Sequence, residues 1–161
     1  MTNVSSSTIR ILVDADACPV KDEIYKVALR HAVPVTIVSN SPIRVPPHDL
    51  IDRVVVSDGF DAADDWIAER ADKSAVCITG DILLADRCLK AGATVLSSNG
   101  KPFTTSSIGS AIATRAIMAD LRAGGDSIGT QVGGPPPFSK TDRSRFLSAL
   151  DETLVRLKRM G

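Results

Sequence analysis

Two short apolar runs of the sequence end in aspartates whose spacing could support metal-ion chemistry. Residues 11–13 are followed by Asp14 and Asp16, and residues 76–78 are followed, after two further residues, by Asp81. Ligands of an open parallel sheet bind beyond the carboxyl ends of its strands, so carboxylates there are placed for a cation or a phosphate. Hard divalent ions prefer oxygen ligands, and the pattern therefore predicts Mg²⁺ or Mn²⁺ held by Asp14, Asp16 and Asp81.

Some of these aspartates also have a purely structural interpretation. Asp16 could cap the helix that follows the first strand, and Asp81 could cap the helix that starts at residue 82. If the strands that precede Asp14 and Asp81 are neighbours, however, the two carboxylates face each other. Their repulsion then amounts to several kcal/mol near a protein surface, which favours a bound cation.

A third acidic group, Asp61, Asp64 and Asp65, stands at the expected start of a helix over residues 62–71. The spacing of Asp61 and Asp64 approximates a capping box, which accounts for part of the group. Asp65 follows Asp61 by one helical turn, so the two side chains share a face. We therefore take Asp61 and Asp65 as candidates to join Asp14 and Asp81 in metal binding and catalysis.

The elements that must position these groups alternate between strand and helix. Apolar residues at helical spacing from Val20 to Ala28 predict a first helix with Pro19 in its first turn. Parallel crossovers need a helix-length connection, so the order predicts an α/β fold: a three-layer, open, mostly parallel sheet with helices on both faces, followed by two C-terminal helices. The expected strands are residues 9–13, 35–38, 53–56, 76–79 and 94–96, and the later helices are 62–71, 82–91, about 108–121 and 139–160.

The composition favours a single domain over residues 1–161, since a chain that is 43% hydrophobic can build a proper core at this length. Residues 1–8 are expected to form a flexible tail and the Gly/Pro-rich residues 125–137 a loop. No apolar stretch approaches the roughly 20 residues that cross a bilayer, and residues 1–8 lack the apolar centre of a signal peptide, so we expect a cytoplasmic protein without a membrane partner.

The three cysteines match no zinc-ligand spacing and predict reduced thiols, two of them in the core. Cys18 is a second candidate for reactivity, because a position near a helix start could lower the pKa of its thiol.

The net charge of zero conceals a split along the chain. Residues 1–100 carry 10 Lys and Arg against 14 Asp and Glu, whereas residues 101–161 carry 9 against 5. An acidic metal site beside a basic flank would produce this split, and so would ordinary surface variation. Ser39 and Asn40, at the end of the second strand, are the candidates for positioning a substrate. The residues that could meet backbone phosphates of RNA or DNA are Arg44, Lys140, Arg143 and Arg145.

Several blocks of the sequence carry a family resemblance: residues 13–19 (VDADACP), 39–46 (SNSPIRVP), 59–65 (GFDAADD), Gly80-Asp81, and 133–136 (GGPP) followed by Asp142-Arg143. With them the chain resembles the bacterial YaiI/YqxD family of uncharacterised proteins over nearly its whole length. That family looks related to the PIN-like nucleases, whose α/β sheet collects acidic residues at strand ends to bind divalent metal and hydrolyse phosphodiesters. The resemblance implies such roles for Asp14, for one acid among Asp61, Asp64 and Asp65, and for Asp81. Gly80 and Leu83 depart from the family pattern, but neither change removes an acid.

The leading hypothesis is thus a metal-dependent nuclease acting on RNA or DNA. The first alternative is a haloacid-dehalogenase-like phosphatase, in which Asp14 would be the nucleophile and Asp16 the acid. The second is a non-catalytic metal- or nucleotide-binding module, although an aromatic content of 4% provides little stacking platform for single strands.

Overall fold

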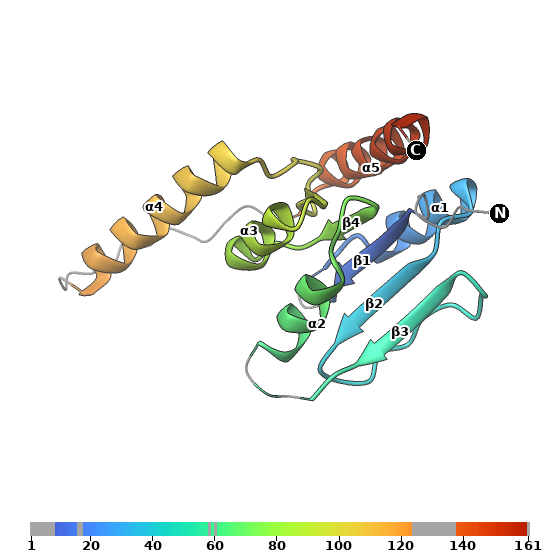
Figure 1. The fold of residues 1–161 in the computed structure, drawn as a ribbon, viewed down its shortest axis with the longest axis horizontal. Coiled ribbons are helices and arrows are strands. Elements are labelled where there is room, and N and C mark those ends of the chain that lie inside the picture. Colours follow the sequence, from blue (N-terminus) through green and yellow to red (C-terminus); the bar gives the residue numbers. More distant parts are fainter. Residues whose placement is uncertain (1–8, 16–17, 58, 60, 124–137, 161) are drawn as a thin grey trace.

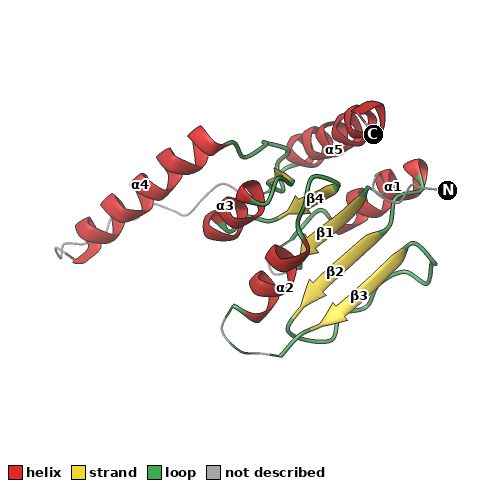
Figure 2. Ribbon diagram, viewed as in Figure 1, coloured by secondary structure: helices red, strands yellow, loops and turns green. Residues whose placement is uncertain are grey.

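The computed structural model describes residues 9–15, 18–57, 59, 61–123 and 138–160. They form a parallel five-stranded sheet with helices on both faces, so the predicted three-layer α/β fold is confirmed (Figure 1; Figure 2). The strands are β1 (Arg10–Asp14), β2 (Val35–Ser39), β3 (Ile51–Val55), β4 (Ala75–Ile78) and β5 (Thr94–Leu96). The helices are α1 (Lys21–His31), α2 (Ala62–Arg70), α3 (Ile82–Lys90), α4 (Thr105–Ala123) and α5 (Lys140–Met160).

Strand β1 lies at the centre of the sheet, whose order is β3-β2-β1-β4-β5. Ile11 is paired with Val35 of β2 on one side and with Val76 of β4 on the other. The chain builds outward from β1 to β3 and then crosses to β4, which makes β1 and β4 neighbours across the point where the strand order reverses. This adjacency is the one that the hypothesis about Asp14 and Asp81 requires.

Successive residues of each strand pack into two different cores. Ile11 and Val13 of β1 belong to the core under α1 and α5, whereas Leu12 belongs to the core under α2, α3 and α4. The same alternation sends Val76 of β4 to the first core and Cys77 to the second. Because both faces of the sheet are covered, the strands read as continuous apolar runs.

The start of α1 differs from the prediction. The helix begins at Lys21, and Val20, rather than the predicted Asp16, occupies the N-cap position, without a side-chain hydrogen bond. Pro19 lies in a turn before the helix rather than in its first turn. A proline disfavours helical backbone at the residue before it, so the chain makes a turn between strand and helix. Asp16 itself lies outside the described residues.

Helix α5 begins with a capping box and is fastened to the start of α1. The Ser139 hydroxyl accepts from the Asp142 amide (3.1 Å), and the Asp142 carboxylate accepts from the Ser139 amide (3.0 Å). One residue later, Arg143 donates to the Pro19 carbonyl (2.6 Å) and pairs with Glu23 (3.4 Å). These contacts place the starts of the two helices side by side.

The ends of α1 and α5 are joined through His31. Its Nε2 lies 2.7 Å from Asp151 Oδ1, and Lys158 Nζ lies 3.2 Å from its Nδ1. A lysine ammonium group only donates, so Nδ1 accepts and Nε2 carries the proton given to Asp151. This hydrogen bond from His31 holds the pKa of Asp151 below its usual range. With starts and ends both matched, α1 and α5 run parallel.

The remaining elements follow the sequence expectations. Cys77 and Cys88 are buried and Cys18 is half-buried, and all three are free thiols, as predicted. Ile108 near the start of α4 is buried, whereas Ile117 further along is exposed, and the helix extends beyond the sheet (Figure 1). No helix in the described part of the chain is long and apolar enough to span a membrane. The predicted tail (1–8) and the predicted loop (125–137) both lie outside the described residues.

We expect Leu150→Ala to lower the free energy of unfolding by about 2–5 kcal/mol, because Leu150 of α5 is fully buried and its truncation leaves a cavity. Leu83→Ala is the matched control: Leu83 is 53% exposed, so the same truncation should cost less than about 1 kcal/mol. Urea unfolding followed by circular dichroism measures both values. Equal effects would contradict the placement of α5 in the core.

Candidate functional site

The carboxyl ends of β1 and β4 bring a buried carboxylate and a buried hydroxyl together. Asp14, the last residue of β1, is only 9% exposed. Thr79, directly after β4, donates a hydrogen bond from Oγ1 to Asp14 Oδ2 over 2.9 Å. A buried carboxylate needs such donors, because an uncompensated charge is costly to remove from water. Sequence reasoning missed Thr79, and the available signal was a hydroxyl residue between an apolar run and Gly80-Asp81.

Asp81 connects this hydrogen bond to the start of α3. Its backbone amide donates to Thr79 Oγ1 (3.0 Å), which leaves the hydroxyl proton for Asp14. Its side chain accepts from the amides of Leu83 (2.9 Å) and Leu84 (3.2 Å) and so caps α3, as the structural interpretation predicted. Asp81 is therefore a helix cap that also stands beside the end of β1.

Asp64, in the first turn of α2, is the member of the third acidic group whose pKa is affected by the charges of Asp14 and Asp81. Partial burial, followed by the charges of Asp81, Asp14 and Asp61, raises the pKa of Asp64 to about 6, while Arg87 of α3 opposes the shift. The site thus has an excess of negative charge. A carboxyl group with a pKa of this kind can also exchange protons near neutral pH, which is typical of functional sites.

The two neighbours of Asp64 on α2 are arranged differently. Asp65 Oδ1 accepts from Arg87 Nη1 over 2.9 Å, in an ion pair whose side chains are about half-exposed. Asp61 occupies the N-cap position with φ 66° and makes no side-chain hydrogen bond to the helix, so the predicted capping box with Asp64 is wrong. The reason is the backbone, since a capping side chain folds back over the helix amides only from an extended conformation.

The predicted substrate-positioning residues follow β2 at the same edge of the sheet. Ser39, the last residue of β2, is buried, and its Oγ accepts from the Ser41 amide (3.1 Å). Asn40 is exposed directly beyond it, and Arg44 is exposed in the loop between β2 and β3. Ser39 therefore supports the local turn, whereas Asn40 and Arg44 are accessible to a ligand.

The basic residues of α5 divide into two kinds. Arg143 is engaged with the start of α1, and its guanidinium lies 5.2 Å from the ring centroid of Phe138. Lys140 and Arg145 are exposed. The structure thus gives Arg143 a fastening role between helices, which its position in the sequence did not reveal.

The hypothesis of a reactive Cys18 is wrong in its physical premise. Burial raises the pKa of the Cys18 thiol, and this outweighs the opposing backbone hydrogen bond at Val20 and the charge of Lys21. The thiol therefore stays protonated at neutral pH and is a poor nucleophile.

The described acids offer a sparse set of metal ligands. Within the described ranges, which exclude Asp16, no three His, Cys, Asp or Glu side chains are grouped so that they could hold a metal ion. The available donors are carboxylate oxygens of Asp14, Asp81 and Asp64. Mg²⁺ fits such a set, because it keeps several waters and is usually held by one or two carboxylates plus substrate phosphates.

Comparison with known proteins gives a consistent family match. The model of a family described as "Uncharacterized BCR, YaiI/YqxD family" matches residues 12–156. A UPF0178 protein of Sphingopyxis alaskensis is 72% identical over 149 residues, which are 92% of this chain and 95% of the relative. A UPF0178 protein of Azorhizobium caulinodans is 60% identical over 153 residues, 95% of this chain and 94% of the relative. No solved structure matches the chain.

We expect Asp64→Asn to raise the melting temperature near neutral pH. The pKa of about 6 lies above the ordinary 3.8, so the folded protein holds this proton more tightly than the unfolded chain does. Ionisation of Asp64 therefore destabilises the fold as the pH rises from 3.8 towards 6, and the uncharged variant avoids this loss. Thermal unfolding across the pH range should show a gain at neutral pH that disappears in acid.

Asp65→Asn is the matched control on the same helix turn, because it removes an ion pair with Arg87 instead of a repulsion. It should give no gain at neutral pH. A stabilisation of equal size in both variants, or a gain from Asp64→Asn that persists in acid, would contradict the assignment.

Proposed function

We propose that this chain, which belongs to the YaiI/YqxD family of uncharacterised bacterial proteins as its motifs predicted, is a divalent-metal-dependent phosphodiesterase that cleaves RNA or DNA. The observation that carries the proposal is that the buried Asp14 at the end of β1 and the α3 cap Asp81 lie close enough to Asp64 for their charges to act on it, although the described side chains form no ready-made group of three metal ligands. The three residues come from separate parts of the chain. Helix capping explains Asp81, but it explains neither the buried Asp14 nor the charge interactions of Asp64.

Electrostatics support a cation at this edge of the sheet. Burial, and after it the charges of Asp81 and Asp14, hold the pKa of Asp64 above its usual range, so the ionised form of Asp64 is disfavoured here. A divalent ion relieves this repulsion more effectively than protonation of one group, because it interacts with several carboxylates at once. Asp16, two residues after Asp14, stays a candidate ligand.

In the proposed reaction, the bound metal ion and the residues around it have separate roles. A bound Mg²⁺ or Mn²⁺ would lower the pKa of water and offset the charge that develops on the phosphate. Asp14 and Asp81 would hold the ion, and the hydroxyl of Thr79 keeps the Asp14 carboxylate in place. Asp64, whose carboxyl group lies within reach of the charges of these two acids, would be placed to accept the proton of the attacking water.

The resemblance to PIN-like nucleases supports the same reaction from the sequence side. It implies roles for Asp14, for Asp81 and for one acid among Asp61, Asp64 and Asp65. Asp64 is our choice for the third role, because its titration depends on the other two. The three free thiols agree with action in the reducing cytoplasm.

We expect the purified protein to cleave single-stranded RNA or DNA with Mg²⁺ or Mn²⁺, and Asp14→Asn to lower kcat/KM by at least about 100-fold. Asp81→Asn separates charge from structure, because asparagine caps a helix as well as aspartate does. It should lose activity similarly without any fall in melting temperature. Asp65→Asn, in the exposed ion pair with Arg87, is the matched control and should retain activity.

The alternatives give different outcomes in the same preparation. Equal background cleavage by the wild type and the Asp14 and Asp81 variants under every metal would overturn the phosphodiesterase. Turnover of a phosphomonoester with capture of a phosphoaspartate on Asp14 would establish the phosphatase. Saturable binding of Mn²⁺ that Asp14→Asn abolishes, without turnover of either substrate, would leave the binding module.

A further inference from the structure

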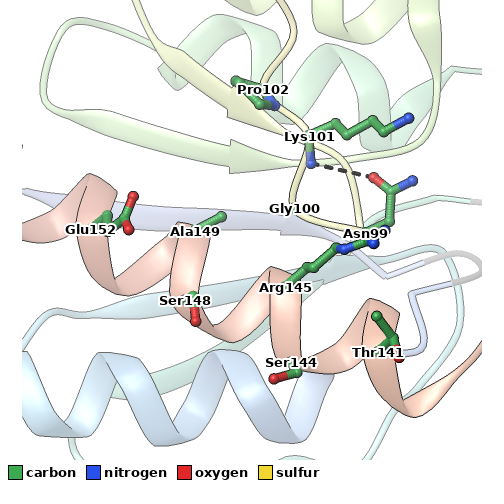
Figure 3. Close-up of a pocket in the computed structure, with 10 residues that line it drawn as sticks. All are labelled: Asn99, Gly100, Lys101, Pro102, Thr141, Ser144, Arg145, Ser148, Ala149 and Glu152. Carbon is green, nitrogen blue, oxygen red and sulfur yellow. Dashed lines mark hydrogen bonds between the residues drawn. The ribbon is translucent and has the colours of Figure 1, made fainter.

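An open pocket of about 460 Å³ lies between the loop that follows β5 and the first half of α5. Figure 3 shows the loop residues Asn99 and Lys101 on one side and α5 on the other, with Arg145 extending from the helix toward Asn99. The volume is in the range of small-ligand sites. None of the acids assigned above to hydrolysis lines this pocket, so it is a second place on the molecule.

A glycine fixes the loop against α5. Gly100 has φ 86°, and a Cβ at this position would lie 2.8 Å from the backbone oxygen of Arg145, so only glycine allows this approach. Hydrogen bonds of 3.0 Å join the Gly100 amide to the Ser97 carbonyl and the Ser97 amide to the Lys101 carbonyl. Asn99 Oδ1 accepts from the Lys101 amide over 3.3 Å. Both walls of the pocket are therefore held in place without a ligand.

The pocket presents two cationic head groups and several hydroxyls. Lys101 and Arg145 are exposed, and among the described residues no carboxylate lies within ion-pairing distance of either. Thr141, Ser144 and Ser148 add hydroxyl groups along α5. Lysine, arginine and hydroxyl groups are the donors that proteins use for phosphate oxygens.

Two acids, Asp142 and Glu152, lie near the two cations of the pocket. Glu152 lines the pocket about two helical turns from Arg145, roughly 10 Å away. Asp142 accepts from the amide and the hydroxyl of Ser139 in the cap of α5; the amide bond is the main reason that its pKa lies below the usual range, and the charges of Arg145 and Lys101 lower it further. One acid therefore lies within electrostatic reach of two cations, which leaves a net positive charge. The cationic end therefore lies at Lys101 and Arg145.

The pocket lies at the same edge of the sheet as the acidic residues. Strand β5 is parallel to β4 and ends at Leu96, so the following loop leaves from the carboxyl edge, two strands from Asp14. Arg143 reaches the Pro19 carbonyl before α1, which independently places the start of α5 at this edge. With strands about 4.8 Å apart, the end of β5, from which the loop leaves, is roughly 10 Å from the end of β1.

We infer that this pocket binds a backbone phosphate of the nucleic-acid strand whose scissile phosphodiester lies at Asp14. The inference rests on the proposed function and adds the contact that holds the substrate. Lys101 and Arg145 neutralise the phosphate, and the hydroxyls of Thr141 and Ser144 donate to its oxygens. A ligand that reaches both places needs phosphates spaced along a chain, which favours a strand over a free phosphate, and the open side of the pocket lets the strand continue.

The test measures binding separately from cleavage. Wild-type protein, Lys101→Ala, Arg145→Ala and the double variant are titrated in EDTA with an end-labelled single-stranded oligonucleotide, and fluorescence anisotropy is followed over a range of salt concentrations. Loss of this one phosphate contact in the double variant should weaken binding and reduce the slope of log K against log salt by about 0.7, and each single variant should show part of this reduction. Arg156→Ala, an exposed arginine of α5 outside the pocket, is the matched control and should leave the slope unchanged.

The outcomes separate this inference from the proposed function. Reduced slopes for Lys101→Ala and Arg145→Ala support phosphate binding in the pocket even when no protein cleaves the oligonucleotide with metal. The absence of cleavage would overturn only the phosphodiesterase proposal. Where the wild type does cleave, the two variants should raise KM more than they lower kcat. Slopes equal to that of Arg156→Ala, or no binding by the wild type at low salt, would overturn the pocket whether or not cleavage occurs.

Discussion

The hydrogen bond from Thr79 to Asp14 joins the ends of the two central strands, and the arrangement of the acidic edge depends on it. Thr79 can give its proton to Asp14 because the amide of Asp81 occupies its oxygen from the other side. The side chain of Asp81 then sets the start of α3. One short series of contacts thus orients a buried carboxylate, shapes the turn after β4 and begins a helix. Without such donors, a carboxylate this deeply buried would lose its charge or destabilise the sheet.

Much of the fold follows from the sequence, because periodicity alone separates strands buried on both faces from amphipathic helices. The adjacency of β1 and β4 was also predictable, since doubly wound sheets favour it. The orientation of α2 about its axis was not. Three acids lie within about one turn of this helix: Asp61, Asp64 and Asp65. The packing of α2 against α3 determines that Asp65 forms the ion pair with Arg87, whereas the charges of Asp14 and Asp81 act on Asp64.

Other features of the molecule depend on tertiary contacts that the sequence does not show. The N-cap position of α1 is occupied by Val20, since the chain turns at Pro19 before the helix begins. The role of Arg143 depends on Glu23, far away in the sequence. Thr79 could be noticed in the sequence as a polar residue at a strand end, but its partner Asp14 becomes evident only once β1 and β4 are known to be neighbours.

The parallel pairing of α1 and α5 has an electrostatic consequence for the whole edge. Helices that follow the strands of a parallel sheet begin at the carboxyl edge, and α5 begins there too, because its start is fastened to that of α1. The peptide dipoles of each helix add up to roughly half a positive charge at its start. The backbone of α1, α3 and α5 therefore supplies a permanent positive field where Asp14 and Asp81 gather. This field offsets part of the repulsion among the carboxylates, independently of lysine and arginine side chains.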